Sequence, residues 1–471
     1  MDIRFGTDGW RDVIAAGFTF ANVRRAAAAY ADHLVARGGG LVLVGYDTRF
    51  LGREFAEQTA AVLAERGLEA RVSVEYLPTP ALSFAVRRYG AAGGVMITAS
   101  HNPPKYGGFK LKGPYGGTAT EAIYADVASR VPAGPVPEGR GSFGTFDVRD
   151  DYYEALEALV DVEALRAAAP RIVHDAIGGA GAGWLAGFAA RTGALEVIEV
   201  RGRPDPLFHG VNPEPIPANV GSTAELMHDA AERPGAPLFA AVTDGDADRL
   251  GVVLPGGGFF DAHQVFAVML DHLHRRGGRG RVVKTFTVSR VIERLAAARG
   301  LNVTETPVGF KYIVDAMLAP GEPVLIGGEE SGGIGLAGHL PERDGIANAL
   351  VLLEAVVTSG EPLAEAFARI ERETGWRHAY DRLDLRLGGA AAMAAVKERL
   401  ADPPGAFGSW RVAGSEDLDG LKLNLERDGE VAAWVLFRAS GTEPLLRVYC
   451  EAPTPADVTE VLAAARRLVE A

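Results

Sequence analysis

Short apolar runs alternate with amphipathic segments over most of the chain, and this alternation limits the possible folds more than any other feature of the sequence. The opening stretch contains three such pairs. The predicted helices are Asn22–Arg37, Arg53–Arg66 and Ala81–Tyr89, and the predicted strands are Leu41–Tyr46, Ala70–Tyr76 and Gly94–Thr98. Strands that alternate with helices are typical of a parallel sheet with helices on both faces.

The same order of elements recurs twice, without clear sequence identity between the cycles. Pro132–Gly144 is rich in Gly and Pro and is predicted to be a linker. The second cycle has predicted helices at Tyr152–Ala168, Ala182–Arg191 and Thr223–Glu232 and strands at Arg171–Ile177, Leu195–Val200 and Leu238–Thr243. The third has predicted helices at Asp261–Arg275 and Ser289–Arg299 and strands at Arg281–Phe286, Val303–Thr306 and Val324–Ile326. We therefore expect three similar mixed α/β-sheet domains.

The C-terminal part has a different pattern. Five strands are predicted there, at Leu383–Leu387, Trp410–Val412, Leu421–Leu425, Ala432–Phe437 and Leu446–Cys450. Helices near Ala390–Leu400 and Ala456–Glu470 accompany them. This pattern predicts a separate and smaller α+β domain. We place the four domains at residues 1–145, 146–255, 256–372 and 373–471.

Composition excludes some classes of partner. The net charge of −13 argues against nucleic acid or an anionic membrane as the main partner, because both require a basic surface. The one cysteine, Cys450, excludes an intramolecular disulfide and is expected to be buried. The N-terminus has no signal-like apolar stretch, and no apolar run approaches membrane-spanning length. We expect a cytoplasmic protein that acts on small molecules, as a monomer or homodimer.

The segment Thr98–Lys110 follows a predicted strand and contains Ser100, a candidate nucleophile. Open α/β sheets bind ligands at the carboxyl ends of their strands. A serine hydroxyl needs help from a base or a metal, and His101 and Lys110 are nearby titratable groups. The alternative is a plain loop in which Ser100 caps a helix, and the residues alone leave both possibilities open.

The segment Asp244–Arg249 also ends a strand and carries three carboxylates at alternate positions, Asp244, Asp246 and Asp248. These groups can face one centre when a hard divalent cation cancels their repulsion. An EF-hand is excluded, because its sixth and twelfth positions are Arg249 and Pro255 here. Three aspartates suit Mg²⁺ completed by a phosphate oxygen. A solvated acidic turn is disfavoured by the apolar runs on both sides.

Two further loops offer groups that bind sugars and anions. Gly327–Gly333 follows a predicted strand and places Glu329 and Ser331 on a Gly-rich loop, where they could accept bonds from sugar hydroxyls. A mobile loop is the alternative. Arg438–Pro444, with Arg447 nearby, combines a guanidinium, hydroxyls and backbone N–H groups into an anion cradle. A hairpin turn with an exposed arginine is the alternative there.

The four loops come from successive regions of the chain, which indicates four domains around one central cleft. Phosphoryl transfer depends mainly on positioning and charge neutralisation, and these loops offer both. Two smaller segments place a cation on a Gly-containing loop, Arg11 in Phe5–Arg11 and Lys311 in Thr306–Lys311.

With these motifs identified, the chain resembles the α-D-phosphohexomutases, the family of phosphoglucomutase and phosphomannomutase. The matching motifs follow the family's order along the chain: Phe5–Arg11, Thr98–Lys110, Asn212–Pro215, Asp244–Arg249, Gly328–Gly332 and Arg438–Pro444. The resemblance implies a phosphoserine at Ser100 and a Mg²⁺ ion held by the three aspartates and a phosphoserine oxygen. It implies that phosphate passes from Ser100 to a sugar monophosphate, and that the bisphosphate then reorients and returns its other phosphate.

The resemblance also implies roles for the remaining residues. Arg11, His101, Lys110, Arg249 and Lys311 would line the reactive centre, with Lys110 a candidate acid/base. Glu329 and Ser331, with Gly309 and Lys311, would bind the sugar. Arg438, Ser440, Gly441, Thr442 and Arg447 would hold the non-reacting phosphate. In chain order the four domains would then be phosphoserine, metal-binding, sugar-binding and phosphate-binding domains.

The sugar loop favours one subfamily. The loop carries Glu330 between Glu329 and Ser331, and in this it resembles the sugar loop of phosphoglucomutases. Bifunctional mannose/glucose enzymes tend to carry Met at this position, and phosphoglucosamine mutases usually carry Gln. We expect an isomerase of carbohydrate metabolism that exchanges glucose 1-phosphate and glucose 6-phosphate. Glucose 1,6-bisphosphate would be its intermediate and activator. Phosphomannomutase or a bifunctional enzyme is the main alternative, followed by phosphoglucosamine mutase, a sugar-phosphate phosphatase and a non-catalytic sensor.

Overall fold

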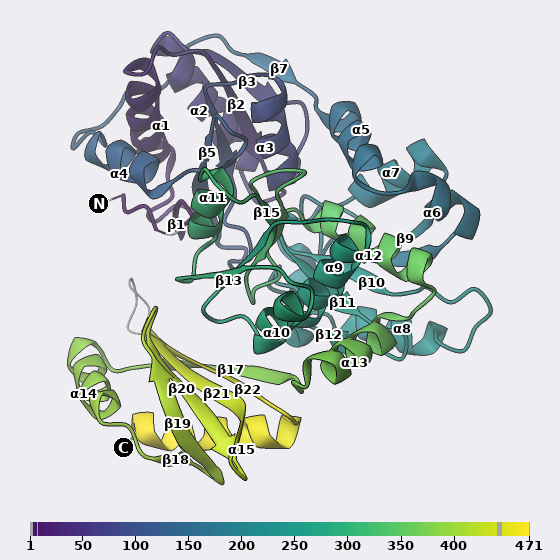
Figure 1. The fold of residues 1–471 in the computed structure, drawn as a ribbon. Coiled ribbons are helices and arrows are strands. Elements are labelled where there is room, and N and C mark those ends of the chain that lie inside the picture. The colour runs from purple at the N-terminus through teal and green to yellow at the C-terminus, as the bar shows by residue number, and fades with distance from the viewer. Residues whose placement is uncertain (1–2, 7, 440–444, 471) are drawn as a thin grey trace. The chain divides into compact units, whose positions relative to one another are not determined.

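A computed structural model describes residues 3–6, 8–439 and 445–470 (Figure 1). The chain forms two compact units. Unit 1 holds Met1–Val283 and Gly309–Ala366, and unit 2 holds Lys284–Val308 and Phe367–Ala471. Each unit is described by itself below.

Unit 1 begins with a seven-stranded sheet in the order β1-β5-β4-β2-β3-β7, with β6 paired to β5. The strands are β1 (Trp10–Val13), β2 (Leu41–Tyr46), β3 (Glu69–Ser73), β4 (Gly93–Ile97), β5 (Tyr106–Gly113), β6 (Gly117–Thr118) and β7 (Gly144–Phe146). Strands β4, β2, β3 and β7 are parallel, as expected, whereas β5 runs antiparallel to β1 and β4.

The antiparallel strand β5 makes this sheet mixed, as expected for the first three domains. No strand was predicted for its segment, which begins with Tyr106-Gly107-Gly108. Both of these glycines are needed for close packing. A Cβ on Gly107 would lie 2.3 Å from the Phe18 ring, and one on Gly108 would lie 2.2 Å from the carbonyl oxygen of Thr98.

Helices cover both faces of this sheet (Figure 1). They are α1 (Phe20–Val35), α2 (Gly52–Glu65), α3 (Thr79–Arg88) and α4 (Glu121–Ser129). Along β2 the side chains alternate between the two faces. Val42 and Val44 join the core under α1 and α2, whereas Gly45 faces Leu82 of α3. Because both faces of β2 are buried, the strand is apolar throughout.

A second sheet in unit 1 has the order β12-β11-β10-β8-β9. Its strands are β8 (Arg171–Asp175), β9 (Glu196–Val200), β10 (Ala240–Thr243), β11 (Leu250–Val253) and β12 (Phe259–Phe260). Its helices are α5 (Arg149–Leu159), α6 (Val162–Ala168), α7 (Trp184–Thr192) and α8 (Gly221–Ala230), with short 3₁₀ turns at Phe208–Gly210 and Pro217–Asn219.

The single helix expected over Tyr152–Ala168 is two helices. Val160 is extended at the break, with φ −120° and ψ 158°. The side chain of Asp161 then caps α6 by accepting from the N–H of Ala164, and its own N–H donates to Glu354. A capping aspartate favours a new helix start over continuation.

The third α/β region contains β13 (Arg281–Thr285), β14 (Val303–Thr306), β15 (Val324–Gly328) and β16 (Ile334–Leu336). Its helices are α9 (Ala262–Arg275), α10 (Arg290–Ala298), α11 (Phe310–Leu318), α12 (Gly345–Ser359) and α13 (Leu363–Thr374). Strand β13 crosses the boundary between the units. In unit 1 the N–H of Arg281 donates to Pro323 just before β15, and in unit 2 the N–H of Phe286 donates to Thr306 at the end of β14.

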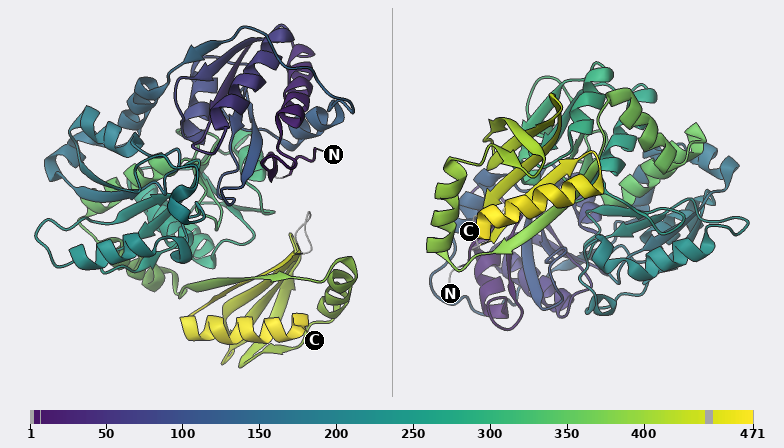
Figure 2. Two further views of the ribbon diagram at one scale, coloured as in Figure 1. Left: turned by 180° about the vertical axis from the view of Figure 1, so that it is seen from behind. Right: turned by 90° about the horizontal axis from the view of Figure 1, so that it is seen from below.

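The C-terminal part of unit 2 is a six-stranded antiparallel sheet in the order β17-β22-β21-β20-β19-β18. Its strands are β17 (Ala379–Arg386), β18 (Ala406–Phe407), β19 (Trp410–Glu416), β20 (Leu421–Arg427), β21 (Glu430–Ala439) and β22 (Leu445–Ala452). Helix α14 (Ala390–Ala401) accompanies the sheet, and α15 (Pro455–Glu470) packs on one face (Figure 2). Cys450 is buried in this core, as predicted.

No single helix among the described residues is long and apolar enough to cross a membrane. The pair α12 and α13 reaches that length and composition together, but the two helices meet at 81°.

Candidate active site

The connection between β4 and β5 holds Ser100 in a strained backbone conformation. Its φ is +51°, in the left-handed region, which costs a residue other than glycine about 1 kcal/mol. Its N–H donates to Thr98 Oγ1 at 2.8 Å, and its Oγ donates to Asp244 Oδ2 at 2.9 Å. Because the connection leads into a strand, Ser100 does not cap a helix. The buried hydroxyl therefore faces the acidic loop.

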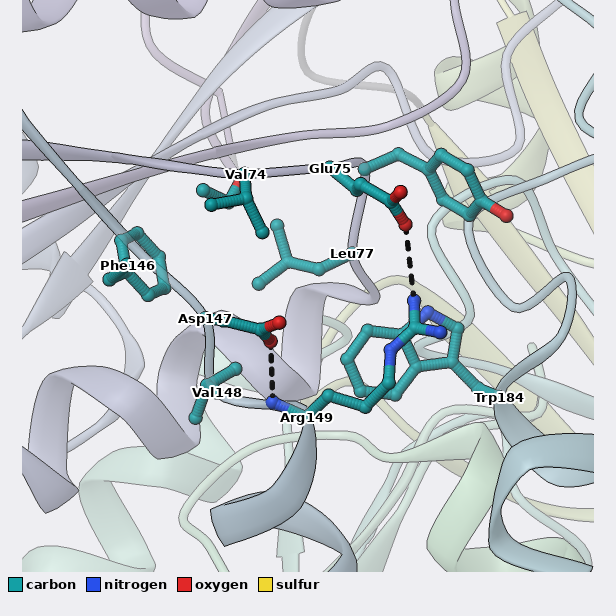
Figure 3. Close-up of a pocket in the computed structure, with 10 residues that line it drawn as sticks. Val74, Glu75, Leu77, Phe146, Asp147, Val148, Arg149 and Trp184 are labelled. Atoms are coloured by element: carbon teal, nitrogen blue, oxygen red, sulfur yellow. Dashed lines mark hydrogen bonds and ion pairs between the residues drawn. The ribbon is translucent and has the colours of Figure 1, made fainter. Parts of the chain in front are cut away.

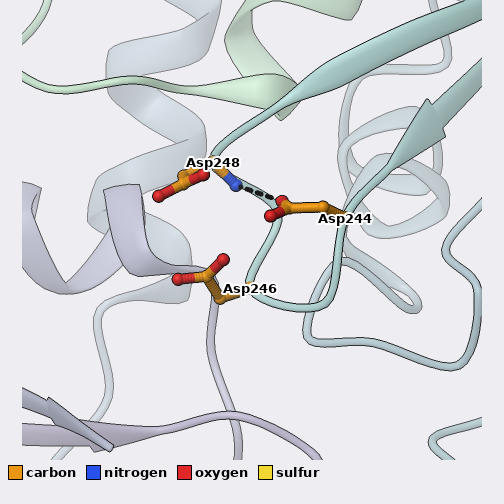
Figure 4. A group of neighbouring side chains, drawn as sticks. All are labelled: Asp244, Asp246 and Asp248. Atoms are coloured by element: carbon orange, nitrogen blue, oxygen red, sulfur yellow. Dashed lines mark hydrogen bonds between the residues drawn. The ribbon is translucent and has the colours of Figure 1, made fainter. Parts of the chain in front are cut away.

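The three aspartates lie on the connection between β10 and β11 (Figure 4). Each can offer one oxygen such that all three oxygens lie within 4.8 Å of one another, and all three side chains are buried. Asp244 Oδ1 accepts from the backbone N–H groups of Asp248 and Arg249, which fixes the turn. Asp246 Oδ1 and Asp248 Oδ1 are buried and accept no hydrogen bond from any described residue.

These carboxylates fit a divalent cation. Burial, together with the charges of Asp248 and Asp246, raises the pKa of Asp244 well above its usual value. Burial would also raise the pKa of Asp246, but Lys110 outweighs it and lowers that pKa. Mg²⁺ prefers oxygen ligands, and these carboxylates have oxygens that accept no hydrogen bond from any described residue. A bound cation would also relieve the repulsion between the carboxylates.

Lys110 lies at the centre of the site. It projects from β5, and its Nζ lies 2.8 Å from Asp246 Oδ2, 3.1 Å from Asp248 Oδ2 and 3.0 Å from Asp8 Oδ2. Burial alone would lower the pKa of Lys110, but these carboxylates raise it well above its usual value. Lys110 is therefore held in its protonated form.

His101, Arg11 and Arg249 are the next residues predicted for the reactive centre. His101 Nδ1 lies 3.5 Å from Ser100 Oγ. Burial, with the positive charges of Arg249 and Arg11, lowers the pKa of His101 well below its usual value, so the imidazole is neutral. Arg11 on β1 donates to Asn102 Oδ1 at 3.0 Å. The Nε atoms of Arg11 and Arg249 are buried and have no hydrogen-bond partner among the described residues.

Asp8 and Arg343 belong to this cluster although sequence reasoning did not select them. Arg343 Nη2 lies 2.6 Å from Asp8 Oδ2 and 2.8 Å from Asp248 Oδ2, and Nη1 lies 3.5 Å from Glu329 Oε2. Asp8 also contacts Lys110. The two residues are 335 positions apart in the chain. Asp8 lies inside the Phe5–Arg11 motif, but nothing in that motif indicates a contact with Arg343. Only the three-dimensional structure brings them together.

The predicted sugar loop is the hairpin between β15 and β16, where the N–H of Glu329 donates to Gly333 at 3.0 Å. Burial is the main cause that raises the pKa of Glu329 to about 7. The N–H of Leu250, at the start of β11, donates to Gly332, and a Cβ on Gly332 would come within 2.6 Å of the Leu250 carbonyl oxygen. This hairpin, which includes Ser331, therefore packs directly on the strand that follows the aspartates.

Lys311 is the second residue of α11, two positions after Gly309, and its Nζ contacts Glu121 Oε2 at 3.0 Å. In unit 2, Arg438 lies near the end of β21 and pairs with Arg447 of β22 in the sheet. Arg438 Nε donates to Asp419 Oδ2 at 2.9 Å. The predicted phosphate ligands Ser440, Gly441 and Thr442 lie outside the described residues.

Two of the cavities in the described part of the chain lie outside this cluster. One, of about 20 Å³, is lined by Leu77, Phe146, Arg149 and Trp184, and the guanidinium of Arg149 lies 4.6 Å from the Trp184 ring (Figure 3). It is too small for a substrate. The other, of about 470 Å³, lies in unit 2 beside Lys284.

Comparisons with known proteins agree with this architecture. The chain matches four family models of phosphoglucomutase/phosphomannomutase: alpha/beta/alpha domain I at residues 2–134, domain II at 150–257, domain III at 261–373 and the C-terminal domain at 386–468. A phosphoglucomutase/phosphomannomutase of Thermococcus kodakarensis is 31% identical over 91% of this chain and 90% of its own length. A phosphoglucosamine mutase of Desulforamulus reducens is 30% identical over 97% of each chain.

Among solved structures, a protein of Thermus thermophilus described as a candidate phosphomannomutase has 47% identity and a TM-score of 0.89, over the full length of both chains. Three mixed α/β sheets followed by an antiparallel C-terminal sheet define a phosphohexomutase fold. The chain belongs to the phosphoglucomutase/phosphomannomutase family, the α-D-phosphohexomutases, and is an enzyme of that class.

Proposed function

We propose that this enzyme interconverts glucose 1-phosphate and glucose 6-phosphate through a phosphoserine at Ser100 and a glucose 1,6-bisphosphate intermediate. The observation that carries the proposal is the 2.9 Å contact between Ser100 Oγ and Asp244 Oδ2. It places a hydroxyl beside the three carboxylates suited to a divalent cation. Mg²⁺ held by Asp244, Asp246, Asp248 and an oxygen of the phosphoserine would supply charge neutralisation for the phosphoryl group.

The chain's own residues have distinct tasks in this proposal. In one half of the reaction the bond between Ser100 Oγ and phosphorus breaks while a sugar hydroxyl oxygen bonds to phosphorus. The proton of that hydroxyl leaves and Ser100 Oγ gains one. Lys110, held protonated by three carboxylates, would exchange these protons. The buried Nε–H groups of Arg11 and Arg249, which donate to no described residue, would donate to the phosphoryl oxygens.

The remaining predicted residues would bind the sugar phosphate. Glu329, Ser331, Gly309 and Lys311 would bind the sugar. Arg438, Ser440, Gly441, Thr442 and Arg447 would hold the non-reacting phosphate. This assigns phosphoserine, metal, sugar and phosphate roles to the domains that we place at residues 1–145, 146–255, 256–372 and 373–471.

The choice of glucose rests on the sequence of the sugar loop, where Glu330 stands between Glu329 and Ser331. Phosphomannomutase and phosphoglucosamine mutase are the second candidates, because relatives with these names align over nearly the whole chain. A coupled assay with the 1-phosphates of glucose, mannose and glucosamine tests the choice. We expect the highest kcat/KM for glucose 1-phosphate. A higher value for either other sugar would contradict the glucose assignment, and release of free phosphate without isomerisation would indicate a phosphatase.

A further inference from the structure

The segment that follows β2, Asp47-Thr48-Arg49, lies against the Ser100 loop and is not part of any motif discussed so far. Its last residue, Arg49, is buried, and oxygen atoms surround its guanidinium. The acceptors are Asp47 Oδ2 at 3.1 Å and the carbonyl oxygens of Ser100, Asn102, Pro103 and Tyr106 at 2.6, 2.7, 2.9 and 3.0 Å. A guanidinium has five N–H donors, so Arg49 uses its full capacity, and four of the five bonds go to one loop.

The backbone N–H of Ser100 is held from the same segment. It donates to Thr98 Oγ1 at 2.8 Å, and this hydroxyl in turn donates to Asp47 Oδ2 at 2.6 Å. Asp47 also receives the N–H and Nε–H of Arg49. The two peptide groups that flank the Cα of Ser100 are therefore both fixed through the Asp47–Arg49 pair. This explains how a serine keeps a φ of +51°, because a strained conformation persists only where its surroundings determine it.

The same segment also contacts the region that carries the aspartates. Thr48 Oγ1 donates to the carbonyl oxygen of Gly178 at 2.9 Å, and the guanidinium of Arg49 lies 4.8 Å from the Phe208 ring. Two residues beyond Gly178, the N–H of Ala180 donates to Gly245 of the aspartate loop at 2.9 Å. A Cβ on Gly245 would lie 2.5 Å from the carbonyl oxygen of Ser100, so the two loops are in close contact.

We infer that Asp47, Arg49 and Thr98 form a positioning device that holds Ser100 in its strained conformation, with its hydroxyl directed at the aspartates, for phosphoryl transfer. None of the three touches the reacting atoms, so they are positioning residues. The inference rests on the proposed role of Ser100 as phosphoryl carrier. A displacement of about 1 Å at a reacting group lowers turnover by about 100-fold. The device therefore acts on kcat, with no effect on the binding of sugar phosphate.

The test is Thr98→Val, which keeps the shape of the side chain but removes the hydroxyl between Asp47 and Ser100. We expect kcat to fall by about 10- to 100-fold with KM for glucose 1-phosphate within twofold of wild type. Thr98→Ser keeps the hydroxyl and should restore kcat to within about threefold of wild type. Thr59→Val is the matched control, since Thr59 is a fully buried threonine in α2 that bonds the carbonyl oxygen of Phe55. Its kcat should not change.

Arg49→Lys is the second variant and decides the matter if Thr98→Val does not fold. One ammonium cannot reach four carbonyl oxygens and a carboxylate, so kcat should again fall at constant KM. A kcat within twofold of wild type in either folded variant would overturn the inference. So would a rise in KM at constant kcat, or a loss in Thr98→Ser equal to that in Thr98→Val.

Ser100→Ala, measured in the same assay, separates this inference from the proposed function. If Ser100→Ala retains turnover, the proposed function is wrong. If Ser100→Ala is inactive while Thr98→Val and Arg49→Lys retain full kcat, Ser100 is the carrier but needs no positioning by this segment. A crystal structure of Thr98→Val adds a readout that does not depend on activity. We expect φ of Ser100 to leave the left-handed region, and an unchanged φ would contradict the inference.

Discussion

Each unit contains a buried cluster of charged side chains, and the two clusters are balanced in different ways. In unit 1, Lys110 contacts two of the three aspartates on one loop, and two oxygens of these aspartates accept no hydrogen bond from any described residue. In unit 2, Lys284 Nζ lies between Glu293 Oε1 at 2.6 Å and Glu305 Oε1 at 2.5 Å. There Lys422 Nζ lies 4.0 Å from the centre of the Phe286 ring and 3.7 Å from Glu305 Oε1.

The difference indicates which cluster has capacity for a further ion. Burial and the mutual repulsion of the aspartates raise the pKa of Asp244, so an added cation would be stabilised there. In unit 2, Lys284 and Lys422 lie among two glutamates, so the charges of these four side chains balance. Burial and the nearby charge of Lys284 lower the pKa of Lys422 to about 8. We expect the first cluster to bind Mg²⁺ and take part in chemistry, and the second to serve the packing of unit 2.

The largest expected effect comes from removing the hydroxyl beside the aspartates. Ser100→Ala should lower kcat by at least about 10⁴-fold, because it removes the hydroxyl that we propose as the carrier of the phosphate. Ser73→Ala is the matched control, since the buried Ser73 Oγ has no hydrogen-bond partner among the described residues. The coupled assay measures both. Substantial turnover by Ser100→Ala would remove the distinction between the two clusters.

Loss of one carboxylate should have the next largest effect. Asp246→Asn removes a charge that we expect to hold Mg²⁺, so the Mg²⁺ concentration for half-maximal activity should rise at least about tenfold. Asp229→Asn on the exposed side of α8 is the control. Isothermal titration and the increase of Tm with added Mg²⁺ check binding directly. An unchanged Mg²⁺ titration for Asp246→Asn would exclude this residue as a ligand.

A substitution in unit 2 should affect binding more than chemistry. Arg438→Ala removes a guanidinium that we expect to contact the non-reacting phosphate. KM for glucose 1-phosphate should rise by about tenfold with a small change in kcat. Arg411→Ala, on β19 of the same sheet and paired with Glu426, should leave both parameters unchanged. A fall in kcat at constant KM would instead place Arg438 in the chemical step.

The smallest expected effect is on stability. The pKa of Lys422 is about 8 in the folded protein and 10.5 in an ordinary lysine, so the unfolded chain binds more protons between these pH values. Wild type should therefore gain stability relative to Lys422→Met as the pH rises from 8 to 10.5, by about 1–2 kcal/mol. Urea unfolding at both ends of this window measures the difference.

Lys397→Met, at an exposed lysine, is the control, and its stability relative to wild type should not change between pH 8 and 10.5. A stability difference between wild type and Lys422→Met that does not depend on pH would contradict the assignment of a lowered pKa to Lys422.

The sequence predicts much of the fold where pattern and structure are local. The predicted strands Leu41–Tyr46 and Val303–Thr306 coincide with β2 and β14, and Asp261 caps α9 where a helix was predicted to begin. Elements without a clear pattern of apolar and polar residues are not predicted. Strand β5 begins with two glycines that allow Phe18 and the Thr98 carbonyl to approach, so only its second half alternates between apolar and charged residues. Helix α12 is apolar on almost every face and gives no amphipathic signal.

In the candidate site, too, the sequence predicts what lies in local motifs. Ser100 and the three aspartates lie in compact motifs, so the sequence selects them, and the structure brings the hydroxyl to 2.9 Å from Asp244. Asp8 lies in the Phe5–Arg11 motif, but its partners Lys110 and Arg343 are far away in the chain. Arg49 and Arg343 also bond mainly to distant groups, and each alone resembles an ordinary charged surface residue. Their burial gives them importance, and burial of a single charged residue cannot be inferred from its neighbours in sequence.

The central claim is that Ser100 carries phosphate to and from the sugar beside an ion held by the aspartates. The most direct measurement is phosphopeptide mapping after incubation with Mg²⁺ and glucose 1,6-bisphosphate labelled on phosphate. We predict a single labelled peptide that contains Ser100, and loss of this label to sugar when glucose 1-phosphate is added. A label on any other residue, or a label on Ser100 that sugar phosphate cannot remove, would contradict the account.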